Sequence, residues 1–177
     1  AMTKAVSTLV TNQESMEPVT KVNRKEMVAR EWPYEGVYRE RGEIPPGYRV
    51  GGTAIVLRSL IESPGWKKDP AQRQSIARGF QFLLDQSLLA PRMGVGFSGG
   101  YDVRDWGHIE ALETVLRMKE LDAIPTKARA AVGKFCQGLI DTLVTNEIPG
   151  GGWNYSRSRR PNRPSAVAKE LETSASP

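Results

Sequence analysis

An internal repeat of about 55 residues constrains the fold of this chain more than any other feature of its sequence. Three amphipathic segments of similar pattern recur along the chain, and a loop that carries aromatic residues follows each of them. The segments are Ala5–Gln13, Ile76–Gln86 and Ala131–Leu143. The loops read EWPYEGVYR, GVGFSGGY and PGGGWNYS. Because each unit of a repeat protein buries its apolar face against its neighbours, we expect similar units to stack in a row.

The apolar spacing within the repeat is that of an α-helix. Val132, Phe135 and Leu139 recur at three- and four-residue steps and form one apolar stripe. A second kind of helix is expected to begin at Gly51 and at Trp106, because a shift of about 55 residues superimposes the apolar positions of these two segments. No segment shows a sustained alternation of apolar and polar residues. We therefore predict an all-α protein, in which any strand pairing is confined to the long loops.

The repeat unit is thus a helix, an aromatic loop and a second helix. We expect a single domain over residues 1–177, divided into three such units. The predicted units span residues 3–63, 70–122 and 126–177. Prolines separate the units, and Asp69 and Thr126 are expected to cap the N-termini of the helices that follow them.

The third unit lacks its second helix, because the sequence given ends where that helix is expected to begin. We therefore expect an incomplete, open toroid-like arc that is truncated at its C-terminus. Phe135 and Leu139 of the last expected helix should then lose part of their cover. Three candidates for covering this open end are a missing C-terminal part, self-association with a second copy, and the N-terminal segment folding back.

Composition and charge narrow the classes of partner. Cys136 and His108 are the only residues of their types, which excludes an internal disulfide and a Cys/His zinc site of the usual kind. We expect no metal site and no cofactor. The net charge is +5, but much of the basic excess lies in the loop Ser156–Ser165 and no recognised nucleic-acid module is present, so nucleic acid is not an expected partner. No apolar run approaches the ~20 residues that cross a bilayer, so we expect no membrane span, while the compartment stays unknown because an earlier signal peptide would leave no trace.

Several residues of the second and third units resemble a known repeat signature, in which a basic residue, glycine, an aromatic, an aliphatic and glutamine precede a Gly-x-aromatic end. The matching residues are Arg78, Gly79, Phe82, Leu83, Gln86, Gly94 to Phe97, Gly151, Gly152 and Trp153. They are similar to the α/α-toroid superfamily of prenyltransferase and squalene-cyclase-like repeats. Within it, WPYEGVYR, GYRVGGT and WGHIEALETVL resemble uncharacterised bacterial repeat proteins more than cyclases. The resemblance implies inner helices that ring a central cavity, with the loops before these helices at its mouth.

The chemistry of the cyclases in this superfamily is not expected here. Those enzymes protonate their substrate from an Asp-x-Asp-Asp motif, and the nearest segment of this chain, Asp102–Asp105, reads DVRD. Arg104 stands where the middle aspartate is usual. Because a neighbouring guanidinium favours the ionised form of a carboxyl group, this segment is a poor proton donor.

The resemblance places a candidate site at the mouth, beside the N-termini of the inner helices, where free N–H groups attract anions. The catalytic candidates are His108, Asp105 and Tyr101. The ligand-binding candidates are Arg49, Thr53, Asp102, Arg104, Trp106, Trp153 and Tyr155. Each candidate also has a structural interpretation. His108 can pack beside Trp106 and hydrogen-bond a loop carbonyl, Asp105 can cap its helix, and the aromatic rings can fill gaps between repeats.

The sequence therefore favours a ligand-binding helical-repeat protein with a site at the loops before the inner helices. Its ligand would be a small molecule or a glycan. The alternative is an enzyme of the same fold that acts on a polysaccharide, as a lyase or hydrolase, or on a terpenoid. An enzyme needs two titratable groups within reach of one substrate atom, whereas a binding protein needs only a shaped aromatic and polar surface. Whether the chain is an enzyme stays open at this point.

Overall fold

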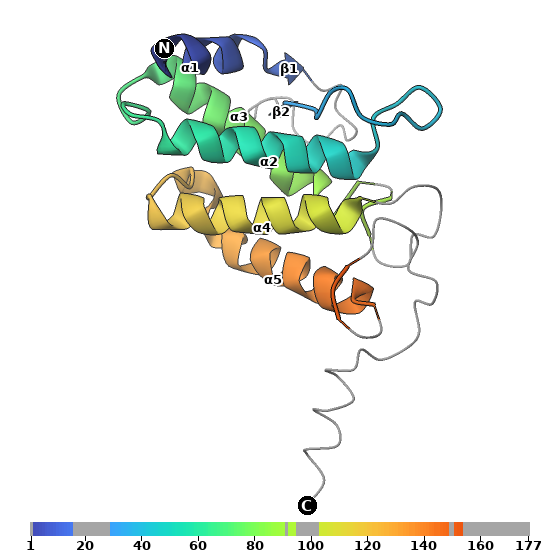
Figure 1. Cartoon of the computed structure of the whole chain (residues 1–177). Coiled ribbons are helices and arrows are strands. Elements are labelled where there is room, and N and C mark those ends of the chain that lie inside the picture. The colour runs from blue at the N-terminus through green and yellow to red at the C-terminus, as the bar shows by residue number, and fades with distance from the viewer. Residues whose placement is uncertain (1, 16–28, 91, 95–102, 149–150, 154–177) are drawn as a thin grey trace, which may run out of the picture.

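The computed structural model describes residues 2–15, 29–90, 92–94, 103–148 and 151–153. Within them the chain forms five α-helices, one short 3-10 helix and one pair of two-residue strands (Figure 1). The α-helices are α1 (Met2–Thr11), α2 (Pro46–Glu62), α3 (Pro70–Gln86), α4 (Arg104–Glu120) and α5 (Arg129–Asn146). The 3-10 helix is η1 (Thr126–Ala128), and the strands are β1 (Glu14–Ser15) and β2 (Arg30–Glu31). The predicted all-α class is confirmed, and the strand pairing does lie in a long loop.

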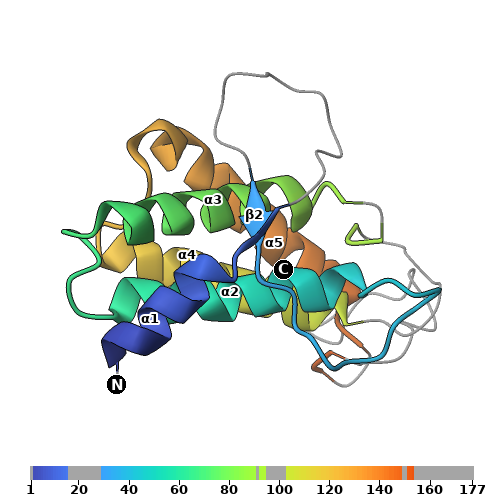
Figure 2. The same ribbon diagram turned by 90° about the horizontal axis from the view of Figure 1, so that it is seen from above.

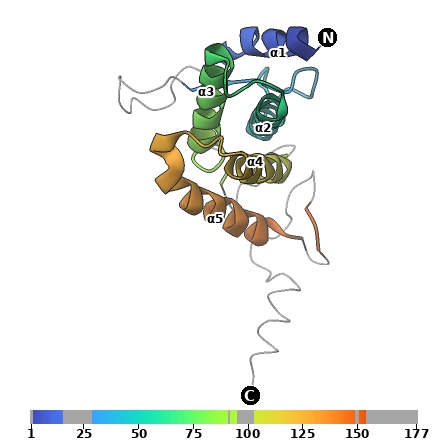
Figure 3. The same cartoon turned by 90° about the vertical axis from the view of Figure 1, so that its left-hand side faces the viewer.

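The helices form two layers. Seen end-on, α2 and α4 lie side by side in one layer, while α1, α3 and α5 follow one another around its other side (Figure 3). The colour gradient shows that α2 and α4 run parallel to each other, and that α3 and α5 run the opposite way (Figure 1). Seen from above, β2 lies over α3, and α1 runs obliquely to α2 and α3 (Figure 2).

The two parallel helices pack with a fixed register. Arg58 of α2 is hydrogen-bonded to Glu113 of α4 at 2.7 Å, and Arg117 of α4 to Glu62 of α2 at 2.9 Å. The members of each pair are 55 residues apart in the sequence. The shift that relates the two helices in the sequence is therefore also the spatial register between them.

Glycines let the first turns of α2 and α4 approach closely. A Cβ atom at Gly47 would lie 2.5 Å from the carbonyl oxygen of Val103, and one at Gly107 would lie 2.8 Å from the carbonyl oxygen of Gly47. Because backbone atoms cannot swing aside as a flexible side chain can, only glycine fits at this crossing. The parallel start of the two helices thus depends on residues without side chains.

The core lies between the two layers and includes Leu57, Phe80, Phe82, Val115 and Met118, of which none is more than slightly exposed. It also takes up Phe135 and Leu139, which are buried, so the expectation that these two lose their cover is wrong. The exposed apolar residues of α5 are instead Ile140, at 41%, and Val144, at 57%. Phe135 and Leu139 lie on the face of α5 that packs against the core. Ile140 and Val144, four residues apart, lie on a neighbouring face of the helix that is exposed.

The two predicted helix caps have different outcomes. Asp69 accepts hydrogen bonds from the backbone N–H groups of Ala71 at 2.9 Å and Gln72 at 3.2 Å, with Pro70 as the first residue of α3, as predicted. Thr126 is not a cap. It is the first residue of η1, and the residue before it, Pro125, occupies the N-cap position without a side-chain hydrogen bond.

Candidate functional site

Three aromatic rings meet at the end of the molecule where α2 and α4 begin. Tyr34 and Tyr48 are stacked, with ring centroids 6.0 Å apart and planes 21° apart. Trp106 is tilted by 59° against both, at 6.0 Å from Tyr34 and 5.8 Å from Tyr48. These separations are those of favourable aromatic pairs. We call Tyr34, Tyr48 and Trp106 the aromatic cluster.

The register between α2 and α4 brings the cluster together. Tyr48 lies in the first turn of α2 and Trp106 in the first turn of α4. Gly51 leaves the space for the indole, because a Cβ atom there would lie 2.3 Å from the ring of Trp106. Half of the surface of Tyr34 is exposed, and Tyr48 and Trp106 are half-buried. The cluster therefore presents ring surface to the solvent.

A neighbouring pair of glycine and threonine holds the loop that carries Tyr34. The fully buried Thr53 accepts a hydrogen bond from the backbone N–H of Trp32 at 3.0 Å. Gly52 lies against the same segment, because a Cβ atom there would lie 2.7 Å from the backbone nitrogen of Tyr34. Thr53 was predicted to bind a ligand, but its side chain lies inside the protein and fixes the position of this loop.

Arg49 also contacts the segment before α2. Its Nε donates to the carboxylate of the buried Glu31 at 2.8 Å, and its guanidinium lies 5.7 Å from the ring centroid of Phe82. Arg49 is half-buried, so one part of this expected ligand-binding residue still reaches the surface. These contacts join β2, α2 and α3.

A buried polar cluster lies beneath the start of α4. It consists of Ser87, Asp105, His108 and Asn146, and each of these residues is buried. His108 Nε2 is 2.8 Å from the backbone oxygen of Ser87, and Asp105 accepts a hydrogen bond from Asn146 Nδ2 at 2.7 Å. His108 Nδ1 lies 3.6 Å from Asp105 Oδ1, which is longer than a hydrogen bond. The cluster ties the end of α3 and the end of α5 to the start of α4.

These contacts bear on the structural interpretations of Asp105 and His108. The prediction that Asp105 caps α4 is wrong, because Val103 is the N-cap residue and the Asp105 carboxylate reaches across to α5. His108 lies in the second turn of α4 at the same end of the molecule as Arg49 and Thr53, as predicted. It has no exposed surface, and it contacts a backbone carbonyl, which is its structural interpretation.

The remaining candidates are divided between the surface and the interior. Arg104 is buried and donates to the backbone oxygen of Gly94 at 2.7 Å. Trp153 lies beyond the end of α5 and is exposed. Its indole N–H donates to the backbone oxygen of Leu143, in the last turn of α5, at 2.8 Å. Tyr101, Asp102 and Tyr155 lie outside the described residues. The predicted site thus separates into an interior polar part and an exposed aromatic part.

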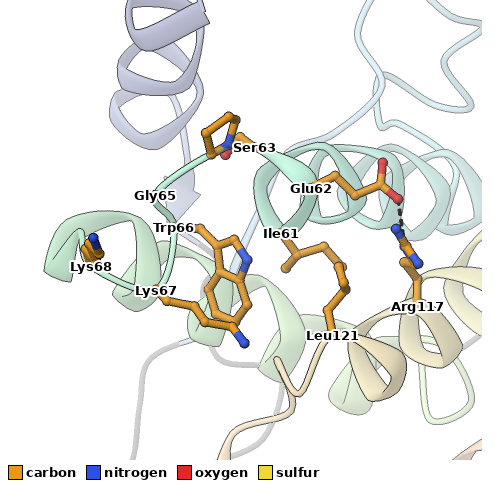
Figure 4. Close-up of a pocket in the computed structure, with 10 residues that line it drawn as sticks. Ile61, Glu62, Ser63, Gly65, Trp66, Lys67, Lys68, Arg117 and Leu121 are labelled. Carbon is orange, nitrogen blue, oxygen red and sulfur yellow. Dashed lines mark hydrogen bonds and ion pairs between the residues drawn. The ribbon is translucent and has the colours of Figure 1, made fainter.

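An open groove of about 630 Å³ lies at the opposite end of the molecule, where α2 ends and a turn leads to α3 (Figure 4). Its walls come from the end of α2, the turn and the end of α4. The lining residues are Ile61, Glu62, Ser63, Pro64, Gly65, Trp66, Lys67, Lys68, Arg117 and Leu121. Sequence reasoning treated this turn only as a break between helices. The signal that it passed over is a tryptophan followed by two lysines.

Sequence reasoning also passed over Tyr48. Its role depends on the parallel start of α2 and α4, which aligns it with Trp106.

Among the residues that the structure describes, no helix is both long enough and apolar enough to cross a membrane. Comparison with family models, with curated proteins and with solved structures finds no match to this chain.

Proposed function

We propose that this chain is a ligand-binding helical-repeat protein of the α/α-toroid type and that its ligand is a glycan. The arrangement of the helices supports the repeat type. The second helices of the first two units, α2 and α4, lie parallel in one layer, and the first helices lie in the other. Contacts at a constant spacing of 55 residues are what consecutive units of one repeat would make.

The aromatic cluster is the observation that carries the proposed ligand class. Its three rings come from a loop and from two helices, and they meet at a partly exposed position. A sugar ring has an apolar face of C–H groups and a polar edge of hydroxyl groups. An aromatic side chain suits both, since its face buries apolar surface and the tyrosine hydroxyl and indole N–H make hydrogen bonds. The cluster lies where α2 and α4 begin, near the loops at which a site is predicted from the sequence.

The burial of His108 and Asp105, two of the three catalytic candidates, favours binding over catalysis. His108 and Asp105 are both buried, and each contacts a group of the protein itself. A general acid or base must come within hydrogen-bond distance of the substrate atom that it serves. A sugar on the surface of the aromatic cluster would touch rings and not these two side chains.

The proposal is tested by affinity electrophoresis in gels that contain soluble xylan, mixed-linkage β-glucan or pectin. We expect at least one of these polysaccharides to retard the wild-type protein in proportion to its concentration. Tyr34→Ala should weaken that retardation about tenfold, the loss expected for truncating an aromatic contact. Trp106→Phe should weaken it less, because a ring remains above Gly51.

Tyr38→Ala is the matched control. Tyr38 lies on the same loop and is exposed to 59%, but it is not one of the three rings. It should keep the wild-type mobility. Equal retardation of the Tyr34 and Tyr38 variants would contradict a role for the cluster, and no retardation by any of the three polysaccharides would contradict the ligand class.

A further inference from the structure

The groove at the end of α2 has the dimensions and the lining of a small-molecule site. Its volume of about 630 Å³ lies within the range of pockets that hold small organic ligands. Figure 4 shows the indole of Trp66 turned toward Ile61 and Leu121, with the Glu62–Arg117 pair on the far side of the groove. Ile61 is buried, and Leu121 and Trp66 are half-buried and packed against the core. The floor is therefore apolar and one wall is a flat ring.

Backbone hydrogen bonds hold the turn that carries Trp66. The N–H groups of Lys68 and Asp69 donate to the carbonyl oxygen of Gly65 at 2.8 and 3.2 Å. Gly65 has a φ of +85°, a conformation that favours glycine. Arg73 of α3 donates to the carbonyl oxygen of Lys67 at 2.8 Å. The turn is thus tied to itself and to α3.

The charges around the groove favour an anion. Three cationic side chains, Lys67, Lys68 and Arg117, line it together with one carboxylate, Glu62. Hydrogen bonds to Glu120 and Glu62 raise the pKa of Arg117, so the guanidinium remains charged and engages the Glu62 carboxylate.

The two lysines differ from Arg117 in their contacts. In the part of the chain that the structure describes, neither Lys67 nor Lys68 lies within ion-pair distance of a carboxylate. The ammonium of Lys67 lies 5.3 Å from the ring centroid of Trp66. A cation is thus held beside an aromatic face, next to an apolar floor.

We infer that this groove binds a small planar aromatic anion. The aromatic part of the ligand lies against the Trp66 indole, over Ile61 and Leu121, and its carboxylate or phosphate group accepts hydrogen bonds from Lys67 and Lys68. Flat apolar surface and a nearby surplus of cations are what such a ligand requires. This site lies at the opposite end of the molecule from the aromatic cluster and is independent of the proposed glycan.

The test uses the whole chain of residues 1–177, labelled with 5-fluorotryptophan, and each of its four tryptophans is expected to give its own ¹⁹F resonance. Trp66→Phe assigns the resonance of Trp66. Titration with 1-naphthoate should shift that resonance saturably, while the resonances of Trp32, Trp106 and Trp153 stay in place. The uncharged 1-naphthamide should bind about tenfold more weakly, because it lacks the charge-assisted contacts. A parallel titration with 1-naphthyl phosphate shows which anionic group the lysines prefer.

Two double variants separate the site from a general effect of net charge. Lys67→Ala/Lys68→Ala should weaken 1-naphthoate binding about tenfold or more. Arg39→Ala/Arg41→Ala removes the same charge from an exposed loop at the other end and should leave the affinity unchanged. Tyr34→Ala should also leave it unchanged, which distinguishes this site from the glycan site. Equal affinities for the naphthoate and the naphthamide, unchanged binding by the lysine variant, or a shift confined to another tryptophan would each overturn the inference.

Discussion

The titratable residues at the two ends of α2 and α4 differ in their burial. Where α2 and α4 begin, Thr53, Asp105 and His108 are buried and bonded to the protein, and aromatic rings reach the surface. Where these helices end, the cations surround a groove beside one indole. Asp105 and His108, which lie close together in the sequence, are therefore inside the protein where the helices begin. The groove lies at the other end, at the turn that carries Trp66. Burial, and not the density of polar residues in the sequence, distinguishes the interior residues from the candidates for binding.

The largest effect should come from the close approach of the helices at the first end. Gly47→Ala places a Cβ atom 2.5 Å from the backbone oxygen of Val103 and should lower the free energy of unfolding by about 3 kcal/mol, as overpacking against backbone does. Gly133→Ala is the control, since a Cβ atom at this position on α5 meets nothing within 4 Å. That variant should gain about 0.5–1 kcal/mol from helix propensity. Urea unfolding measures both, and a similar effect of the two substitutions would remove the distinction between the ends.

A smaller loss should follow from opening the buried polar cluster. Asp105→Ala leaves the buried amide of Asn146 without its acceptor and should cost about 2 kcal/mol in unfolding free energy. Asp105→Asn retains an oxygen that can accept the same hydrogen bond, so it should cost less than half as much. Thermal and urea unfolding give the two values. If both variants matched the wild type in stability but altered glycan binding, Asp105 would belong to the site and not to the interior.

The smallest effect concerns a carboxylate of α3 at the same end. Burial raises the pKa of Asp85, although its hydrogen bond from Gln81 opposes the shift. The folded state therefore binds the proton more tightly than the unfolded state, and stability falls as the pH rises from the unfolded pKa through the folded one. Asp85→Asn removes this loss and should gain only about 0.3 kcal/mol at pH 7, because the group is half exposed to solvent screening.

The gain should disappear at pH 3, where the carboxyl group of the wild type is protonated in both states. Urea midpoints at the two pH values give the comparison. A variant that is less stable than the wild type at pH 7 would show that the charge of Asp85 itself stabilises the fold.

The fold followed from local patterns more fully than the helix boundaries did. The apolar stripe and the period predicted the helices, because both depend on spacing along the chain. The predicted starts were late for α2 and α4, at Gly51 and Trp106. Two charged residues, Arg104 and Asp105, precede Trp106 in α4, and Pro46 and Gly47 begin α2, so the first residues of both helices carry no apolar signal. Thr126 is not a cap because Pro125 occupies the N-cap position and the 3-10 helix begins at Thr126 itself.

The site was predictable only where one residue type carried the signal. Trp106 was predicted as a candidate because an apolar helical pattern begins there in the sequence. Tyr48 was not, since its ring gains a partner only from the register between two helices. The groove joins Trp66 to Leu121, which are more than 50 residues apart in sequence, so no local pattern could indicate it. The burial of His108 likewise involves a contact distant in sequence, with the backbone oxygen of Ser87 at the end of α3.

The ion pairs between α2 and α4 depend on which helix carries the positive and which the negative residue at each position. At positions 55 residues apart, α2 carries Arg58 and Glu62, whereas α4 carries Glu113 and Arg117. The pairs attract because the sign inverts from one helix to the next. If two identical copies of either helix lay side by side in this register, like charges would face each other at both positions. Each exposed pair contributes little stability. Together they mean that neither helix can replace the other. The same arrangement of backbones favours α2 beside α4 and disfavours two copies of either helix side by side.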